Sequence, residues 1–247
     1  MVSLEGKIFL SFDVEEARNP DGSLVPERLD CSADGVNSIL DFLEELQIPA
    51  TFFATGFFSA KKPQAIKRIV KAGHEVASHG YRHVRLAGLG REEINGEIAS
   101  SVKALAKATG KKPKGFRAPF FSVNNAVLDA VEAQGFKYDS SLDKSIAMAF
   151  RNHGANFKRP KLREFQISHF PVLRLPMSWH WARRLGPAYV STAIKLNLRL
   201  YGQAILFFHS WEFADSGKKF AWQLKGTLKK FDKSLFFRMG DCLEGFA

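Results

Sequence analysis

The sequence predicts an α/β fold of the barrel type, and two observations support this prediction. Short apolar runs alternate along the 247 residues with longer segments of helical period, which is the pattern of a βα-repeating fold. Polar side chains come at, or just after, the ends of four of these runs, KIFLSF, HEVAS, PKGF and AILFF: they are Asp13, His79, His83, Arg117 and His209. In α/β barrels, catalytic residues from several strand ends converge on one rim. We therefore expect a metal-dependent hydrolase.

The expected elements follow in chain order from the apolar patterns. We expect strands at 8–12, 50–55, 74–78, 115–119, 136–140 and 204–208. Helices are expected at 34–46, 63–72, 92–108, 125–134, 188–201 and 220–231, where apolar residues recur every three or four positions. The pattern weakens over 144–169, which predicts a long loop or irregular insertion, and regular order returns at 171–176.

Length and charge limit the class of protein. A chain of 247 residues with 45% hydrophobic content can bury a full core, and no repeat or linker divides it, so we expect one domain over 1–247 with a helical tail at 218–247. The formal net charge is +11, but Lys and Arg are scattered and form no nucleic-acid motif. A solvated basic surface is therefore favoured over a nucleic-acid partner, with an anionic surface as the alternative.

Location and redox state are predicted from the same sequence. The N-terminus lacks the pattern of a secretory signal, and no apolar run approaches the length of a membrane span, so a cytoplasmic location is expected. Cys31 and Cys242 lie far apart and fit no metal or redox spacing. They are expected to be two ordinary reduced thiols.

The segment SHGYRH carries His79 and His83 four residues apart, which places both on one face if the segment is helical. Two imidazoles at this spacing can bind one Zn²⁺ ion. The preceding His74 and Glu75 suggest the helical zinc-protease motif, but HEVASH is one residue too long for it. A protease of that type is therefore excluded.

A catalytic zinc site needs a third protein ligand, and SFDVEE offers Asp13, Glu15 and Glu16. In an extended segment, residues two apart point the same way, so Asp13 and Glu15 are expected to share a face. One of them can bind the metal while the other takes a proton from the metal-bound water. Glu16 is expected to point to the other face of the extended segment. Either Glu15 or Glu16 could still be the metal ligand.

These residues lie in four motifs that occur in the order SFDVEE, SHGYRH, GFRAPFF and ILFFHSWEF. Together with ATFFATG and YDSS, they resemble the motifs of the polysaccharide deacetylases, carbohydrate esterase family four with its NodB homology domain. The resemblance is narrower to the branch whose first motif reads Asp-Val-acid, and it runs from about residue 7 to 213. It implies a distorted (β/α) barrel of about seven strands and metal-dependent removal of an N-acyl group from an amino sugar.

The resemblance implies a base and a set of metal ligands. Asp13 matches the catalytic base, and His79 and His83 match the two metal-binding histidines. Glu15 stands where this branch usually has an aspartate ligand, which is a departure. One divalent ion is implied, Zn²⁺ before Co²⁺, Ni²⁺ or Mn²⁺, all of which two histidines and a carboxylate accept.

Five further residues receive roles from the same resemblance. Arg117 matches the arginine that orients the base, here expected to make a bidentate contact, and His209 matches the general acid. Asp139 lies near the motif whose aspartate orients that histidine. Phe120 replaces a frequent tyrosine but keeps the backbone N–H that would bind the oxyanion, and Trp211 is expected to contact substrate.

The expected function is metal-dependent N-deacetylation of an amino sugar or related amide, with metal-bound water as the nucleophile. A close alternative is a membrane-surface deacylase or deformylase of a lipid-linked amino sugar, suggested by the Trp, Arg and Leu content of 179–202. It is not favoured, because the helix at 188–201 is expected to pack on the barrel. The other alternative is a non-catalytic homologue that binds a carbohydrate or polyanion. The presence of Asp13, His79, His83 and His209 argues against it.

Overall fold

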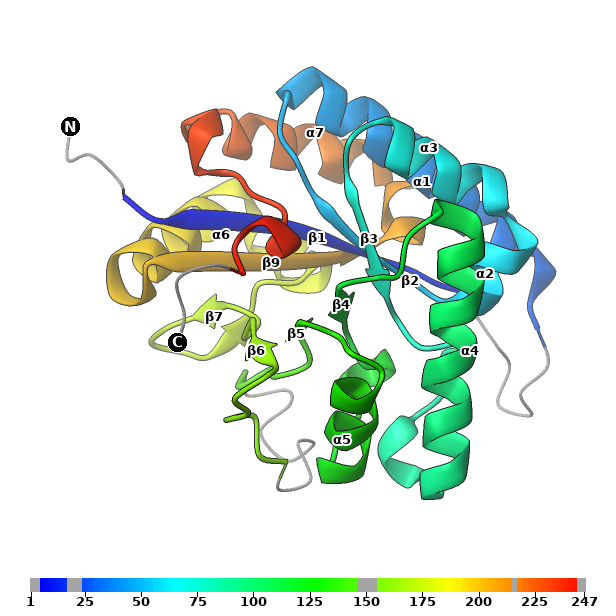
Figure 1. The fold of residues 1–247 in the computed structure, drawn as a ribbon. Coiled ribbons are helices and arrows are strands. Elements are labelled where there is room, and N and C mark those ends of the chain that lie inside the picture. The colour runs from blue at the N-terminus through cyan, green and yellow to red at the C-terminus, as the bar shows by residue number, and fades with distance from the viewer. Residues whose placement is uncertain (1–4, 17–23, 146–154, 215–216, 244–247) are drawn as a thin grey trace.

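The structure is a computed structural model that describes residues 5–16, 24–145, 155–214 and 217–243. Its main feature is a curled sheet of seven parallel strands in the order β6-β5-β4-β3-β2-β1-β9, and a two-stranded antiparallel sheet, β7-β8, lies beside it (Figure 1). The predicted barrel-type fold of about seven strands is confirmed.

The strands of the main sheet are β1 (Lys7–Val14), β2 (Thr51–Ala54), β3 (Glu75–Ser78), β4 (Gly115–Phe116), β5 (Tyr138–Asp139), β6 (Arg163–Glu164) and β9 (Gln203–His209). The small sheet contains β7 (His169–Phe170) and β8 (Leu175–Pro176). The helices are α1 (Pro26–Leu46), α2 (Gly56–Lys61), α3 (Pro63–Lys71), α4 (Arg91–Thr109), α5 (Asn125–Ala133), α6 (Trp179–Tyr201) and α7 (Lys218–Leu228). Short 3₁₀ turns are η1 (Leu86–Gly88), η2 (Pro119–Phe121), η3 (Ser210–Phe213), η5 (Lys233–Leu235) and η6 (Met239–Asp241).

Two helices begin earlier than their apolar patterns indicate. Helix α1 begins at Pro26, because a proline in the first turn sacrifices no hydrogen bond and its fixed φ suits a helix. Helix α6 begins at Trp179 and is interrupted at Gly186, which has a φ of 77° and is followed by Pro187. The break separates an N-terminal piece, which sequence periodicity does not reveal, from the predicted helix.

The segment that the sequence predicts to be irregular contains strand β6, which completes the sheet. β6 is only two residues long, too short to produce an apolar period. Beyond it, the Ser168 N–H donates to the Ile205 carbonyl at 3.1 Å, and the Ile205 N–H donates to Ser168 Oγ at 2.9 Å. These bonds join the two edges of the curled sheet. The predicted regular order at 171–176 is mainly the turn between β7 and β8.

Alternate residues of β1 face opposite sides of the sheet, one side toward the outer helices and the other toward the barrel interior. Ile8, Leu10 and Phe12 belong to the hydrophobic cluster between the sheet and the outer helices, while Phe9 belongs to a separate cluster inside the barrel. Because side chains alternate between the two faces of a strand, Asp13 lies on the same inner face as Phe9. The same alternation on β9 places Ile205, Phe207 and His209 inward.

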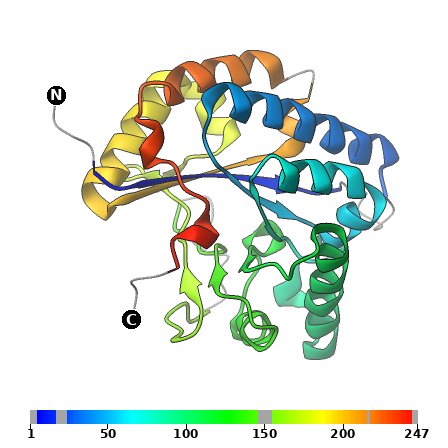
Figure 2. The same cartoon turned by 45° about the horizontal axis from the view of Figure 1, so that its top comes forward.

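The helices surround the outside of the sheet, with α1, α3 and α7 on one side and α4 and α5 on the other (Figures 1 and 2). Helix α6 buries one apolar face, which confirms the expectation that it packs on the barrel; the buried residues include Tyr189, Val190, Ala193, Ile194 and Leu198. None of the helices in the described ranges is long and apolar enough to cross a membrane.

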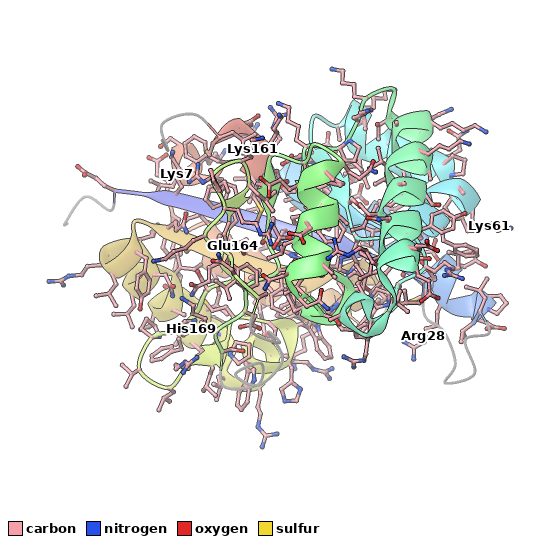
Figure 3. All side chains as sticks on the ribbon, turned by 60° about the horizontal axis from the view of Figure 1, so that its bottom comes forward. Lys7, Arg28, Lys61, Lys161, Glu164 and His169 are labelled. Atoms are coloured by element: carbon pink, nitrogen blue, oxygen red, sulfur yellow. The ribbon has the colours of Figure 1, made fainter. Side chains whose placement is uncertain are left out.

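The C-terminal segment closes the barrel at the N-terminal ends of the strands. The Phe237 N–H donates to the Ile8 carbonyl at 3.0 Å, and Met239 is fully buried in the interior cluster. Figure 3 shows Lys7 and Lys161 on the left of the molecule and Arg28 and Lys61 on the right, in agreement with the scattered charge of the sequence. Both cysteines are free, as expected.

A matched pair of glycines tests the packing that positions the segment after His209. A Cβ at Gly35 of α1 would lie 1.9 Å from the carbonyl oxygen of Ser210, whereas a Cβ at the exposed Gly96 of α4 meets nothing within 4 Å. We expect Gly35→Ala to lower the free energy of unfolding by about 1–3 kcal/mol. Gly96→Ala is expected to raise it by roughly 0.5–1 kcal/mol, because alanine loses less backbone entropy in a helix. Urea denaturation of both variants measures this, and equal effects would contradict the packing.

Candidate active site and metal centre

The predicted site residues gather at the C-terminal ends of the parallel strands. Asp13 on β1 is directly paired in register with His209 on β9. His79 directly follows β3, and its N–H continues the ladder by donating to the Ala54 carbonyl at 2.9 Å. Parallel pairing therefore brings Asp13, His79 and His209 together at the C-terminal edge of the sheet.

Glu15, His79 and His83 form a cluster with the ligand atoms of a metal site. Nε2 of His79 lies 3.3 Å from Glu15 Oε2, and Nε2 of His83 lies 2.7 Å from the same oxygen. All three ligand atoms are within 4.8 Å of one another. Nδ1 of His79 is 2.9 Å from the Arg117 carbonyl oxygen, to which it can only donate. This bond fixes the tautomer and leaves the lone pair of Nε2 directed toward Glu15.

A tight turn, and not a helix, brings His79 and His83 together. Their spacing places them on one face only if the segment is helical, and this condition is not met. Residues 79–83 have no helical assignment, and the turn contains Gly80 at a φ of +73° and His83 at a φ of 48°. A histidine with positive φ is uncommon and costs free energy, so the surrounding structure must hold it in place. The histidine pair is therefore placed by a strained loop.

The cluster fits a divalent cation on the chemistry of its donors. Glu15 Oε2 is buried and makes no hydrogen bond, although two imidazole nitrogens are its neighbours. Burial by itself would raise the pKa of Glu15, but the attraction of His83 and His79 outweighs it and holds the pKa well below its ordinary value. Two nitrogens and one carboxylate oxygen are a donor set of catalytic zinc sites, which keep one position open.

The structure separates the two glutamates of the first motif. Glu15 faces the histidines, whereas Glu16 Oε2 accepts a hydrogen bond from Thr55 Oγ1 at 2.6 Å. Thr55 in turn caps helix α2 by accepting from the Phe58 N–H at 3.1 Å. Glu16 therefore supports the start of α2, and Glu15 is the glutamate placed to bind a metal.

Arg117 is fully buried and orients Asp13, as the resemblance implies. Nη1 donates to Asp13 Oδ1 at 2.7 Å, Nη2 donates to Ser11 Oγ and Ser140 Oγ at 3.0 Å each, and Nε donates to the Ser140 carbonyl at 3.1 Å. The contact with Asp13 is thus through one nitrogen and not bidentate, because the serines occupy the rest of the fork. Asp13 Oδ2 stays directed toward the cluster, 3.9 Å from His79 Nε2.

Asp139 does not fill the place predicted for it, because the carboxylate that contacts His209 in the structure is that of Glu212. Nδ1 of His209 is 2.8 Å from Glu212 Oε1, and the His209 N–H donates to Glu212 Oε2 at 2.8 Å. Asp139 is buried and accepts from Ser141 Oγ at 2.7 Å, and Ser141 Oγ accepts from the Ala118 N–H at 2.8 Å. Asp139 therefore supports the loop next to Arg117.

The pKa of His209 is raised to about 10 in the metal-free protein. Burial disfavours the imidazolium, but the Glu212 carboxylate outweighs that effect, and Glu15 and Asp13 add to it. The ring that faces the site is accordingly protonated at neutral pH. A protonated imidazole beside this cluster of Glu15, His79 and His83 can act as a general acid.

An aromatic ring packs against a histidine on each of two sides of the site, at His83 and at His209. Phe120 lies in η2 with a φ of 57°, and its ring is 4.4 Å from the ring of His83. Trp211 is stacked on His209 at 5.1 Å and 21°. Both rings therefore lie beside site histidines, and the oxyanion role of Phe120 and the substrate contact of Trp211 stay predictions.

Sequence reasoning missed the polar residues that hold the site together, although two of them carried a signal. Ser11 lies two residues before Asp13 and therefore on the same face of the strand. Glu212 lies three residues after His209 and forms a capping box with it, a spacing that can be read from a sequence. No such pattern distinguishes Ser140 or Ser141, which act through tertiary contacts.

Residues 5–138 match the model of the polysaccharide deacetylase family, so the chain belongs to this family. It is 33% identical over 108 residues to the peptidoglycan deacetylase of Helicobacter pylori, covering 44% of this chain and 37% of that protein. The chain spans less than half the length of the curated relatives it matches.

Two solved structures share the fold. A carbohydrate esterase of family 4 from Streptomyces lividans, in complex with acetate, superposes with a TM-score of 0.60 at 19% identity and covers 96% of this chain and 93% of its own. A family pseudoenzyme from Bacillus anthracis superposes with a TM-score of 0.63 at 16% identity, covering 97% and 66%. The fold therefore occurs both in a carbohydrate esterase and in a pseudoenzyme.

The assignment of Glu15 predicts a difference between two adjacent and isosteric substitutions. Glu15→Gln is expected to weaken Zn²⁺ binding by more than the roughly 10–100-fold that loss of an outer-shell partner costs. Glu16→Gln is expected to leave affinity unchanged, because the amide oxygen still accepts from Thr55. Competition with a chromogenic chelator measures both, and circular dichroism confirms folding. A loss of affinity in Glu16→Gln alone would reverse the assignment.

The His209–Glu212 pair predicts a pH effect of definite sign. Since the folded pKa of about 10 lies above an unfolded value of about 6.5, the pair stabilises the fold fully below pH 6.5 and loses this effect as pH rises through 10. Glu212→Gln is expected to lower the pKa of His209 markedly in an NMR titration of the metal-free protein. It should also destabilise the protein more at pH 6 than at pH 10. An unchanged titration curve would exclude Glu212 as the cause.

Proposed function

We propose that the protein is a metal-dependent hydrolase that removes an N-acetyl or other N-acyl group from an amino sugar. The observation that carries this proposal is the single rim on which Asp13, His209 and the cluster of Glu15, His79 and His83 meet. Membership of the polysaccharide deacetylase family and identity to a peptidoglycan deacetylase support the reaction class.

A divalent ion held by Glu15, His79 and His83 would polarise the acyl carbonyl and lower the pKa of a coordinated water. The protein supplies the proton transfers. Asp13, held through Oδ1 by Arg117 and free at Oδ2, is placed to accept the proton of the attacking water. This use of one oxygen for positioning and the other for chemistry keeps the base in a fixed orientation.

His209 is the proposed general acid. Its Nδ1 is engaged by Glu212, so Nε2 carries the proton that would be delivered to the departing amine. The Phe120 N–H, in the positive-φ turn whose ring packs against His83, is the proposed donor to the oxyanion. One such donor contributes about 3–4 kcal/mol to transition-state stabilisation.

The fold does not decide between an enzyme and a binding homologue, because a pseudoenzyme shares it. The side chains favour an enzyme. The base, the ligand cluster and the acid are all present, and Arg117 and Glu212 hold the base and acid in orientation. The cytoplasmic location remains a prediction from the sequence.

The proposal predicts that turnover and metal content are lost together. His79→Ala is expected to lose both bound metal and release of amine from N-acetylated chitooligosaccharides, and the exposed His180→Ala is expected to lose neither. Asp13→Asn and His209→Ala are expected to keep metal while kcat/KM falls by about 10²–10⁴-fold, the usual contribution of a general base or acid. Elemental analysis and amine detection measure both quantities. Full activity in chelator, after verified removal of metal, would refute the proposal.

A further inference from the structure

A rigid loop carries Arg85 along the edge of the proposed site. Arg82 is tied down, because its backbone N–H and Nε donate to the buried Glu97 carboxylate at 3.0 and 2.5 Å. The Ala87 N–H donates to Ser122 Oγ at 3.2 Å, and the Ala87 carbonyl accepts from Asn124 Nδ2 at 3.1 Å. The loop that bears Arg85 is thereby bound at two points to the segment that follows Phe120.

The Arg85 guanidinium lies over the Phe120 ring, and the same ring packs against the proposed metal ligand His83. The guanidinium carbon is 4.5 Å from the Phe120 ring centroid, and that ring is 4.4 Å from the ring of His83. Phe120 is 39% exposed, and Arg85 is exposed. Among the ion pairs seen in the described ranges, none contains Arg85, in contrast to its neighbour Arg82.

The cation–π contact with Phe120 leaves the N–H donors of Arg85 available. None of the hydrogen bonds among the described residues uses these donors, which are the groups that recognise carboxylate and phosphate. An arginine that serves only to solubilise a surface gains nothing from a fixed position on a ring beside a metal ligand. The position of Arg85 is therefore that of a preorganised anion receptor.

A second arginine occupies a comparable position on the other side of the site. The Arg183 guanidinium is 4.9 Å from the Trp179 ring, Trp179 contacts Trp211 at 6.4 Å, and Trp211 is stacked on His209. Arg183 is exposed, and no ion pair within the described part of the chain includes it. Two rings separate Arg183 from its site histidine, against one for Arg85, so Arg85 is placed closer to the reacting group.

We infer that the substrate of this site carries an anionic group, a carboxylate or a phosphate, on or next to the N-acylated sugar, and that Arg85 on its Phe120 platform binds this group. The inference rests on the proposed function and names its substrate class. A neutral sugar would need the aromatic platform alone, whereas an anion uses both the platform and the unpaired guanidinium. Arg183 is the supporting cation on the side of His209.

The test compares neutral and anionic substrates of one N-acetyl sugar series. The probes are fully N-acetylated chitotetraose (below, chitotetraose) as the neutral substrate, the N-acetylglucosamine–N-acetylmuramic acid disaccharide as the carboxylate, and N-acetylglucosamine 1-phosphate as the phosphate. We expect the metal-loaded wild type to prefer at least one anion in kcat/KM. Arg85→Gln should reduce that value about tenfold, the usual effect of a lost charge-assisted hydrogen bond, and leave chitotetraose unchanged. The kcat/KM of Arg85→Lys on the anionic substrate should lie between those of wild type and Arg85→Gln, because lysine keeps the charge without the planar fork.

Arg184→Gln is the matched control, since it removes the same charge from an exposed position adjacent to Arg183. The anionic substrate whose kcat/KM falls in Arg85→Gln shows whether Arg85 binds a carboxylate or a phosphate. Equal effects of Arg85→Gln and Arg184→Gln, or equal losses on neutral and anionic substrates, would overturn the inference while leaving the hydrolase intact. If no substrate is turned over, the proposed function fails, and calorimetric binding of the two anionic sugars to wild type and Arg85→Gln still decides the inference.

Discussion

The buried guanidinium of Arg117 is the group on which both the barrel interior and the site depend. A charge removed from water is tolerated only when its hydrogen-bonding capacity is used, and Arg117 uses it on β1 and on the segment after β5. Its guanidinium carbon also lies over the Phe53 ring of β2, 4.0 Å from the ring centroid. Removal of any one partner would leave a charge or donor unsatisfied. The same bonds that fix Asp13 also connect the segment after β4 to β1 and to the segment after β5.

The interior of the barrel is arranged in layers that follow from this constraint. Aromatic side chains fill the end opposite the site, where Phe9, Tyr138 and Phe165 pack edge to face. Arg117 and its serines form the next layer, and the carboxylates and histidines lie above them. The buried Asp139 and the half-buried Glu164 lie side by side in the barrel wall, where desolvation raises the pKa of both carboxyl groups.

Much of the fold could be predicted because the elements that build it are long and periodic. β1, β9, α4 and α5 were found within a few residues of their observed ends, and the alternation on β1 placed Glu15 beside Asp13 correctly. The two-residue strand β6 and the start of α6 could not be found, because their boundaries depend on sheet closure and on a kink at Gly186. Sequence motifs identified His79 and His83 but left Glu15 and Glu16 both open, and the structure separates the two glutamates. The positions of Ser140, Ser141 and Asp139 depend on which loop packs beside Arg117.

The turns that complete the site explain why its details are hidden from periodicity. His83, Phe120 and Phe121 all have positive φ, at 48°, 57° and 54°, and each such residue costs on the order of 1–3 kcal/mol. No regular element could place His83 Nε2 and the Phe120 ring on the same small volume, because helices and strands fix side-chain spacing. The strain is affordable only where the loops are bound elsewhere, as they are through Ser122 and Asn124. The site is therefore a set of strained turns held by a well-packed frame, and the contacts of that frame decide which side chains reach the reacting atoms.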